Sequence, residues 1–147
     1  MIRSFSLSDL EPVLEIERQA FPKSPYDWAT FISLHYLYPR TFWVYVEKLA
    51  SQGEEKILGY IVFSQDGHII SLAVHPQFRR KGVGKELLSK MMNYPNIRQL
   101  RAEVRRSNTG AQSFYLKIGF QVIGEVPNYY GNEDALIIQW VRPSLEE

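Results

Sequence analysis

A cluster of cationic residues and glycines in the middle of the chain has the composition of an anion-binding loop. Its cations are Arg79, Arg80, Lys81 and Lys85, and its glycines are Gly82 and Gly84. The cluster follows an apolar run typical of a buried strand and precedes apolar residues that recur at helical spacing. Glycine lets the backbone approach a ligand closely, and the free N–H groups at a helix N-terminus attract phosphate. The residues therefore predict a phosphate site, with a solvated turn before a helix as the alternative.

The spacing around this loop argues against the two common nucleotide-binding motifs. A P-loop requires serine or threonine after Gly84-Lys85, but Glu86 stands there, and Arg79 occupies the position of the first glycine. A dinucleotide-binding GxGxxG motif would need glycine in place of Leu87. The spacing excludes a nucleoside triphosphatase and disfavours a dinucleotide-binding enzyme.

Composition and charge narrow the function classes further. The chain has no cysteine, which excludes disulfides, thiolate catalysis and cysteine-ligated zinc. The three histidines are widely spaced, so we expect no metal, and we interpret His68 and His75 as turn or strand-end residues. A net charge of +1 provides no general basic field for nucleic acid. The longest apolar stretches have only strand length and the N-terminus has no signal pattern, so we expect a cytoplasmic protein with no nucleic-acid or membrane partner.

Hydrophobic periodicity predicts the elements that hold these residues. Strands are expected near 2–7, 41–48, 57–64, 68–74, 98–104, 120–124 and 135–141, and helices from Ser8 or Asp9, from Ser24 or Asp27, from Val83 and near 107–118. This order predicts one α/β domain over residues 1–147, with a mixed central sheet of about seven strands flanked by about four helices.

Two ordered motifs resemble the GNAT superfamily of N-acetyltransferases. Arg79-x-x-Gly82-x-Gly84 is similar to its pyrophosphate loop, R/Q-x-x-G-x-G/A. At the expected distance follows Asn108-x-x-Ala111-x-x-Phe114-Tyr115-x-Lys117-x-Gly119-Phe120. The resemblance covers essentially the whole chain. It implies acetyl-CoA as the acetyl donor and a sheet that splays into a V between its fourth and fifth strands.

The resemblance also implies which residues hold the cofactor. Backbone groups of Leu72, Ala73 and Val74 would bind the pantetheine arm as an added strand would, and the Val74 amide would polarise the thioester carbonyl. The pyrophosphate would lie on Arg79, Arg80, Lys81, Gly82, Val83, Gly84 and Lys85. The second motif would border the rest of the cofactor with Asn108, Ala111, Phe114 and Lys117. Alternatively, Asn108 is only a helix N-cap, and Ala111 and Phe114 belong only to the core.

Two residues are candidates for acid–base catalysis. In similar enzymes a tyrosine at the position of Tyr115 donates a proton to the departing CoA thiolate. Helical spacing alone favours a packed core tyrosine there. Glu103, on the predicted strand 98–104, is the matching base, because an attacking amine must first lose its proton. The alternative for Glu103 is a cross-strand ion pair with Arg101 or Arg105.

Within the superfamily, the chain resembles the protein N-terminal acetyltransferases, particularly the bacterial enzyme that acetylates a ribosomal protein's α-amine and its archaeal relatives. The resemblance rests on the opening Ile2-Arg3 with residues 14–18, on the turn 21–26, and on residues 128–136. It implies that the acceptor is a protein or peptide N-terminus, ribosomal proteins included. Phe21, Pro22 and Tyr26 with Tyr129 and Tyr130 would clamp its first residues. Tyr26 stands where tryptophan is common.

Two other functions remain open from the sequence. One is acetylation of a small amine such as a polyamine, an amino acid or an antibiotic, for which an acidic pocket would be the sign. The other is a noncatalytic acyl-CoA-binding module, which the presence of both Glu103 and Tyr115 disfavours.

Overall fold

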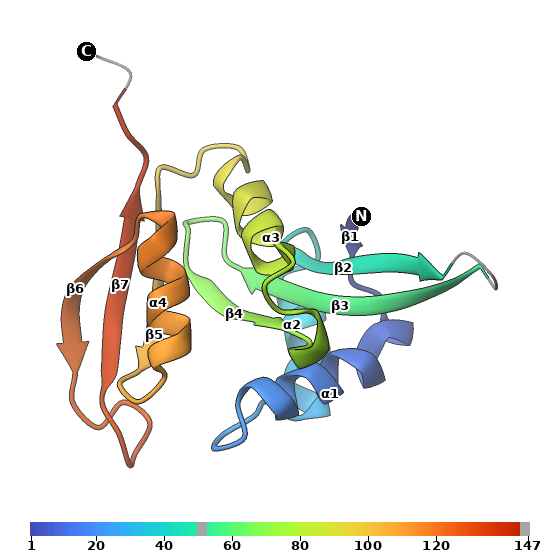
Figure 1. The fold of residues 1–147 in the computed structure, drawn as a ribbon, viewed down its shortest axis with the longest axis horizontal. Coiled ribbons are helices and arrows are strands. Elements are labelled where there is room, and N and C mark those ends of the chain that lie inside the picture. The colour runs from blue at the N-terminus through green and yellow to red at the C-terminus, as the bar shows by residue number, and fades with distance from the viewer. Residues whose placement is uncertain (50–52, 145–147) are drawn as a thin grey trace. The chain divides into compact units, whose positions relative to one another are not determined.

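The computed structural model describes residues 1–49 and 53–144, which form two compact units (Figure 1). The first unit comprises Met1–Ser64 and Ile70–Asn93, and the second comprises Gln65–Ile69 and the chain from Tyr94 onward. No helix among the described residues has the length and apolar character needed to cross a membrane.

A four-stranded sheet organises the first unit. Its elements in chain order are β1 (Ile2–Ser4), a 3-10 turn (Leu7–Asp9), α1 (Leu10–Ala20), α2 (Trp28–Leu37), β2 (Phe42–Leu49), β3 (Glu54–Phe63), β4 (Ile69–Val74), a second 3-10 turn (Pro76–Phe78) and α3 (Val83–Met92). The strand order is β1-β2-β3-β4, and β2 pairs antiparallel with both β1 and β3.

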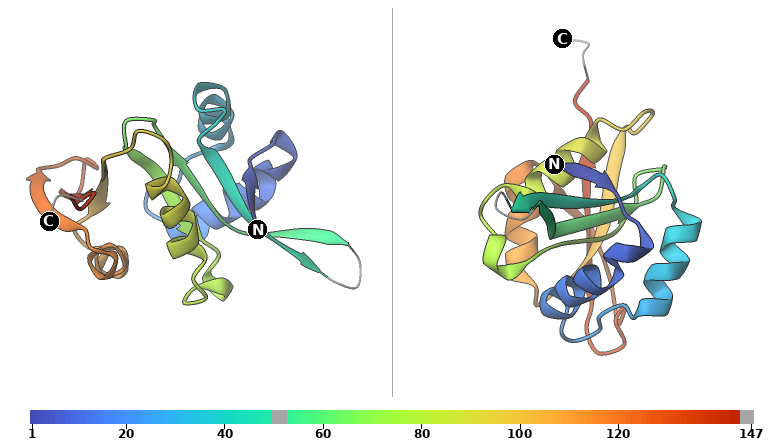
Figure 2. Two further views of the ribbon diagram at one scale, coloured as in Figure 1. Left: turned by 90° about the horizontal axis from the view of Figure 1, so that it is seen from above. Right: turned by 90° about the vertical axis from the view of Figure 1, so that its right-hand side faces the viewer.

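Helices cover both faces of this sheet (Figure 2). On one face, Tyr60 and Val62 of β3 share a buried cluster with Val13 of α1 and Phe31 of α2. On the other face lies α3, whose Lys90 ammonium is 5.1 Å from the ring centroid of Trp43 in β2. The central strand β3 is therefore buried on both sides, which explains its nearly continuous apolar sequence.

The second unit is a three-stranded antiparallel sheet with one α-helix. It contains β5 (Gln99–Arg105), α4 (Thr109–Ile118), β6 (Gln121–Val126) and β7 (Ala135–Val141), in the order β5-β7-β6. Gln112 of α4 donates a hydrogen bond to the Arg105 carbonyl at 3.1 Å, and the Tyr115 and Phe120 rings meet edge to face at 5.0 Å. These contacts fix α4 beside β5.

The turn before β4 also belongs to the second unit and requires glycine at its closest point. Gly67 has a φ of +100°, and a Cβ atom there would lie 2.0 Å from the Gln99 carbonyl oxygen. Its own carbonyl accepts the Arg101 N–H at 2.9 Å, and His68 forms an isolated parallel bridge with Arg101. The Asp66-Gly67 turn thereby brings His68 to β5.

Within residues 1–49 and 53–144, the structure confirms the seven strands and four α-helices expected from periodicity. The strands form two sheets, and the fourth and fifth strands, between which the splay is expected, belong to different sheets. Several boundaries differ for local reasons. Of the two predicted starts of the second helix, Asp27 is correct as its N-cap, because its carboxylate accepts the Thr30 N–H at 2.9 Å. The strand predicted from Ile57 begins at Glu54, since antiparallel pairing continues to Leu49.

Candidate active site

A carboxylate, an imidazole and a phenol meet on β5. Alternate residues of this strand are buried, and Glu103 lies on the half-exposed face. The His68 Nε2 atom is 2.8 Å from the Glu103 Oε1 atom, and the Tyr129 hydroxyl donates to the same oxygen at 3.3 Å. These three side chains come from the turn before β4, from β5 and from the loop between β6 and β7.

The Glu103 carboxylate is stabilised in its charged form. The hydrogen bond from His68 is the main cause that lowers the Glu103 pKa below its ordinary value, against the opposing effect of burial. The hydrogen bond from Tyr129 and the charge of Arg101 lower it further. Glu103 is therefore ionised at neutral pH and acts as a hydrogen-bond acceptor.

The structure does not support a cross-strand ion pair as the role of Glu103. Arg101 lies 3.5 Å from the Asp66 carboxylate, and Arg105 lies 3.0 Å from that of Glu133. The hydrogen-bond partners of the Glu103 side chain are His68 and Tyr129. The carboxylate thus faces groups that can exchange protons.

The predicted tyrosine pair lies against the same strand. The Tyr130 hydroxyl donates to the Glu103 backbone carbonyl at 3.3 Å, and the Arg105 guanidinium lies 4.1 Å from the Tyr130 ring centroid. The two tyrosine rings meet edge to face at 4.9 Å. Tyr129 is nevertheless 49% exposed, so its ring has surface left for a ligand.

Tyr115 combines a buried ring with an accessible hydroxyl. Its ring lies edge to face against Phe114 and Phe120, and the residue is 7% exposed. Among the described residues, every fully buried side-chain oxygen or nitrogen has a hydrogen-bond partner. The Tyr115 hydroxyl has no hydrogen-bond partner among them. The hydroxyl oxygen must therefore reach the accessible surface. Burial, together with the charges of Glu103 and Tyr130, raises the Tyr115 pKa well above its usual value, so the hydroxyl stays protonated.

The other predicted cofactor residues of the second unit follow one side of α4. Asn108 is the N-cap, with its side-chain oxygen accepting the Ala111 N–H at 3.1 Å, as its alternative interpretation expected. Ala111 and Phe114 are only half-buried, and Lys117 is exposed. These two half-buried side chains are therefore not confined to the core.

The basic loop of the first unit ends in an uncapped helix. Gly82 is the N-cap of α3 with a φ of +82°, and because it has no side chain it makes no cap hydrogen bond to the first amides of the helix. The positive φ is one that glycine adopts without steric cost. Arg79 is anchored by a hydrogen bond from its Nε to the Val74 carbonyl at 3.4 Å. The cationic residues of the loop thus directly precede and begin a helix N-terminus, an arrangement that fits a diphosphate.

Of the predicted acceptor residues in the first unit, Pro22 and Tyr26 are exposed and Phe21 packs against the core cluster. The Tyr26 and Phe31 rings meet edge to face at 5.9 Å. The segment 21–26 therefore presents an aromatic and a proline at the surface beside the N-terminus of α2.

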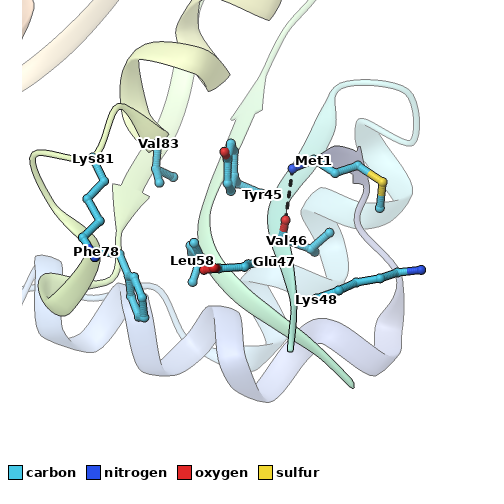
Figure 3. A pocket seen from close by; sticks show the side chains of 9 residues that line it. All are labelled: Met1, Tyr45, Val46, Glu47, Lys48, Leu58, Phe78, Lys81 and Val83. Atoms are coloured by element: carbon cyan, nitrogen blue, oxygen red, sulfur yellow. Dashed lines mark hydrogen bonds between the residues drawn. The ribbon is translucent and has the colours of Figure 1, made fainter. Parts of the chain in front are cut away.

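A separate pocket of about 590 Å³ lies over β2 and β3 in the first unit (Figure 3). Among its lining residues are Tyr45 and Leu58 from the strands and Phe78, Lys81 and Val83 from the segment before and at the start of α3. It shares only Lys81 and Val83 with the predicted cofactor residues. Among the described residues, no three histidine, aspartate or glutamate side chains are grouped to hold a metal ion.

The sequence pattern predicts His68 as a turn or strand-end residue, where it lies, but does not indicate its contact with Glu103. The contact with Glu103 joins residues 35 positions apart, and no periodic pattern reports it. The available signal was the Asp66-Gly67 turn, whose glycine permits the close approach to β5.

The family of the chain is shown by its similarity to known proteins. The profile of the acetyltransferase (GNAT) family matches residues 10–120, so the chain belongs to this family. It is 38% identical to an uncharacterized N-acetyltransferase of Methanocaldococcus jannaschii, covering 99% of this chain and 94% of that protein. It is 30% identical to an N-alpha-acetyltransferase of Sulfurisphaera tokodaii, covering 93% and 90%. The crystal structure of Ard1 from Thermoplasma volcanium superposes with a TM-score of 0.84 at 32% identity, covering 98% of each chain. The protein is an N-acetyltransferase.

Proposed function

We propose that the protein transfers an acetyl group from acetyl-CoA to the α-amine of a protein or peptide N-terminus. The observation that carries this proposal is the cluster of His68, Glu103 and Tyr129. An α-ammonium group has a pKa of about 7.7–8.0, whereas that of lysine is about 10.4. A carboxylate whose pKa is lowered is a weak base, which suits the α-amine far better than the lysine amine. The relative named as an N-alpha-acetyltransferase supports the same acceptor class.

We propose that acetyl-CoA is held by the residues that the two sequence motifs indicate. In the first unit, the backbone of Leu72, Ala73 and Val74 binds the pantetheine arm, and the loop 79–85 with the first N–H groups of α3 binds the pyrophosphate. In the second unit, Asn108, Ala111, Phe114 and Lys117 contact the cofactor along α4. When bound, acetyl-CoA supplies an acetyl group activated as a thioester.

The acetyl transfer is proposed to use three residues with different roles, which are Glu103, Val74 and Tyr115. Glu103 accepts a proton from the acceptor ammonium, so that the neutral nitrogen attacks the acetyl carbon. The Val74 amide polarises the carbonyl oxygen as the carbon–nitrogen bond forms. Tyr115 would donate its hydroxyl proton to the departing thiolate and regain a proton from solvent, while the attacking nitrogen would release its second proton, and Glu103 the proton it accepted, to solvent.

The acceptor's first residues are proposed to bind Tyr129 and Tyr130, and Phe21, Pro22 and Tyr26 are proposed as further acceptor-binding residues. The two tyrosines border Glu103, and they are held by hydrogen bonds to its side chain and its backbone. Their rings would therefore direct the amine to the base.

Acetyl-CoA is expected to raise the melting temperature, because a ligand that binds only the folded state stabilises it by about 2.7 kcal/mol at a hundred times its Kd. ATP and nicotinamide dinucleotides should raise it far less, since the loop lacks their motifs. Thermal melting with each ligand at equal concentration measures the difference. Stabilisation by ATP and not by acetyl-CoA would contradict the assigned cofactor.

The acceptor class is tested by CoA release with a panel of N-terminal peptides, free amino acids and polyamines. Peptides with a free α-amine should be acetylated, and the same peptides with a blocked N-terminus and an internal lysine should not. Mass spectrometry then locates the acetyl group. Efficient acetylation of a polyamine without peptide turnover would replace the proposal by small-amine acetylation.

A further inference from the structure

A carboxylate outside the catalytic cluster is buried in the first unit. Glu17, near the end of α1, is 2% exposed. Its Oε2 atom accepts the Tyr26 backbone N–H at 2.9 Å. Its Oε1 atom accepts hydrogen bonds from the Tyr60 hydroxyl and, at 3.4 Å, from the Ser71 hydroxyl. Within the part of the chain that the structure describes, its hydrogen-bond partners include no lysine, arginine or histidine.

This environment is costly for a carboxylate. Burial raises the Glu17 pKa, and the hydrogen bonds from Tyr26, Tyr60 and Ser71 only partly oppose the rise. An apolar residue of similar size would fill the space without that cost. The hydrogen bonds from Tyr26, Tyr60 and Ser71 therefore indicate the role of the Glu17 carboxylate. It holds separate segments of the chain in one arrangement.

The segments that it joins carry the proposed binding residues. Tyr26 closes the acceptor segment 21–26, in which Pro22 and Pro25 have no N–H to donate. Ser71 lies on β4 directly before Leu72, and its hydroxyl is 2.9 Å from that of Tyr60 on β3. Glu17 thus connects the acceptor segment to the strand proposed to bind the pantetheine arm.

We propose that Glu17 is a positioning residue for the acceptor, which fixes the segment 21–26 through the Tyr26 amide and ties it to β3 and β4. This inference rests on the proposed function of that segment in acceptor binding. Without the hydrogen bond from the Tyr26 amide to Glu17, the segment 21–26 occupies its binding arrangement for only part of the time. The apparent affinity for the acceptor peptide then falls by that fraction. We expect acetyl-CoA binding to change little when Glu17 is replaced, because β4 remains paired with β3 in the sheet.

The test compares three variants in steady-state kinetics with an N-terminal peptide that the wild-type protein acetylates. Glu17→Met keeps the side-chain volume but removes the oxygens that accept the hydrogen bonds from Tyr26, Tyr60 and Ser71. It should raise the peptide KM about tenfold, whereas the acetyl-CoA KM should change less than about twofold. Glu17→Gln should restore the peptide KM to within about threefold, because its amide oxygen can accept the Tyr26 N–H while its NH₂ donates to Tyr60. Tyr60→Phe is the matched control, since it leaves the Tyr26 bond in place and should raise the peptide KM less than Glu17→Met.

Several outcomes would overturn the proposal. One is a folded Glu17→Met protein with the wild-type peptide KM. Another is an equal rise in the KM of both substrates, which indicates a general structural role.

If Glu17→Met does not fold, amide exchange measured by NMR in the wild-type protein tests the proposal instead. The Tyr26 amide should be protected, and exchange at the rate of an open chain would contradict its hydrogen bond to Glu17. Failure of the wild-type protein to acetylate any peptide would instead refute the proposed function.

Discussion

Replacement of Glu103 by glutamine should lower kcat/KM for peptide acetylation by about a hundredfold at pH 7, the lower end of the range for loss of a general base. Glutamine keeps the size of the side chain and can still hydrogen-bond to His68 and Tyr129, but it cannot accept a proton. The loss should be largest near pH 6, where the α-amine is protonated. It should shrink above the amine pKa of about 7.7–8.0, where neutral acceptor is already present.

The measurement is kcat/KM for wild-type and variant protein from pH 6 to pH 9. The wild-type carboxylate remains ionised over this whole range because its pKa is lowered, so its own titration does not shape the profile. Glu125→Gln is the matched control, since this glutamate lies on β6 and pairs with Arg106 on the surface. A Glu103→Gln enzyme with wild-type rates at every pH would show that another group removes the proton.

Replacement of Tyr115 by phenylalanine should lower kcat by about a hundredfold and leave the acetyl-CoA KM within about twofold. The ring and its contacts with Phe114 and Phe120 are retained, so the melting temperature should change little. Only the hydroxyl is lost. Because burial raises its pKa, Tyr115 is a weak acid whose hydrogen bond to the sulfur strengthens as negative charge develops there.

Steady-state kinetics with saturating peptide, and thermal melting with and without acetyl-CoA, separate chemistry from binding. Tyr36→Phe serves as the control, because this tyrosine is 70% exposed on α2 and takes no part in the proposed site. An unchanged kcat for Tyr115→Phe would make Tyr115 a core residue only. A large rise in the acetyl-CoA KM would assign it to cofactor binding.

Local sequence determined the elements and the cofactor motif. Alternation in 98–104 and helical spacing in 83–92 report which face of each element is buried, because a side chain's direction follows from the backbone period. The spacing of Arg79, Gly82 and Gly84 identified the loop, since its function depends on the backbone of neighbouring residues. The second motif likewise lies within one helix and its N-cap. These features are local, so one sequence suffices to find them.

Only the tertiary structure decided which side chains meet. His68 reaches Glu103 because Gly67 lies against Gln99, and Tyr129 reaches the same carboxylate from a loop that follows β6. The buried network of Glu17 similarly depends on the packing of α1 against β3. Periodicity records the direction of each side chain but not its partner, because partners depend on strand pairing, on the register and on the close approach of distant segments. The surroundings of the proposed base Glu103 therefore follow from the fold, whereas the loop proposed to bind the cofactor is evident from the sequence alone.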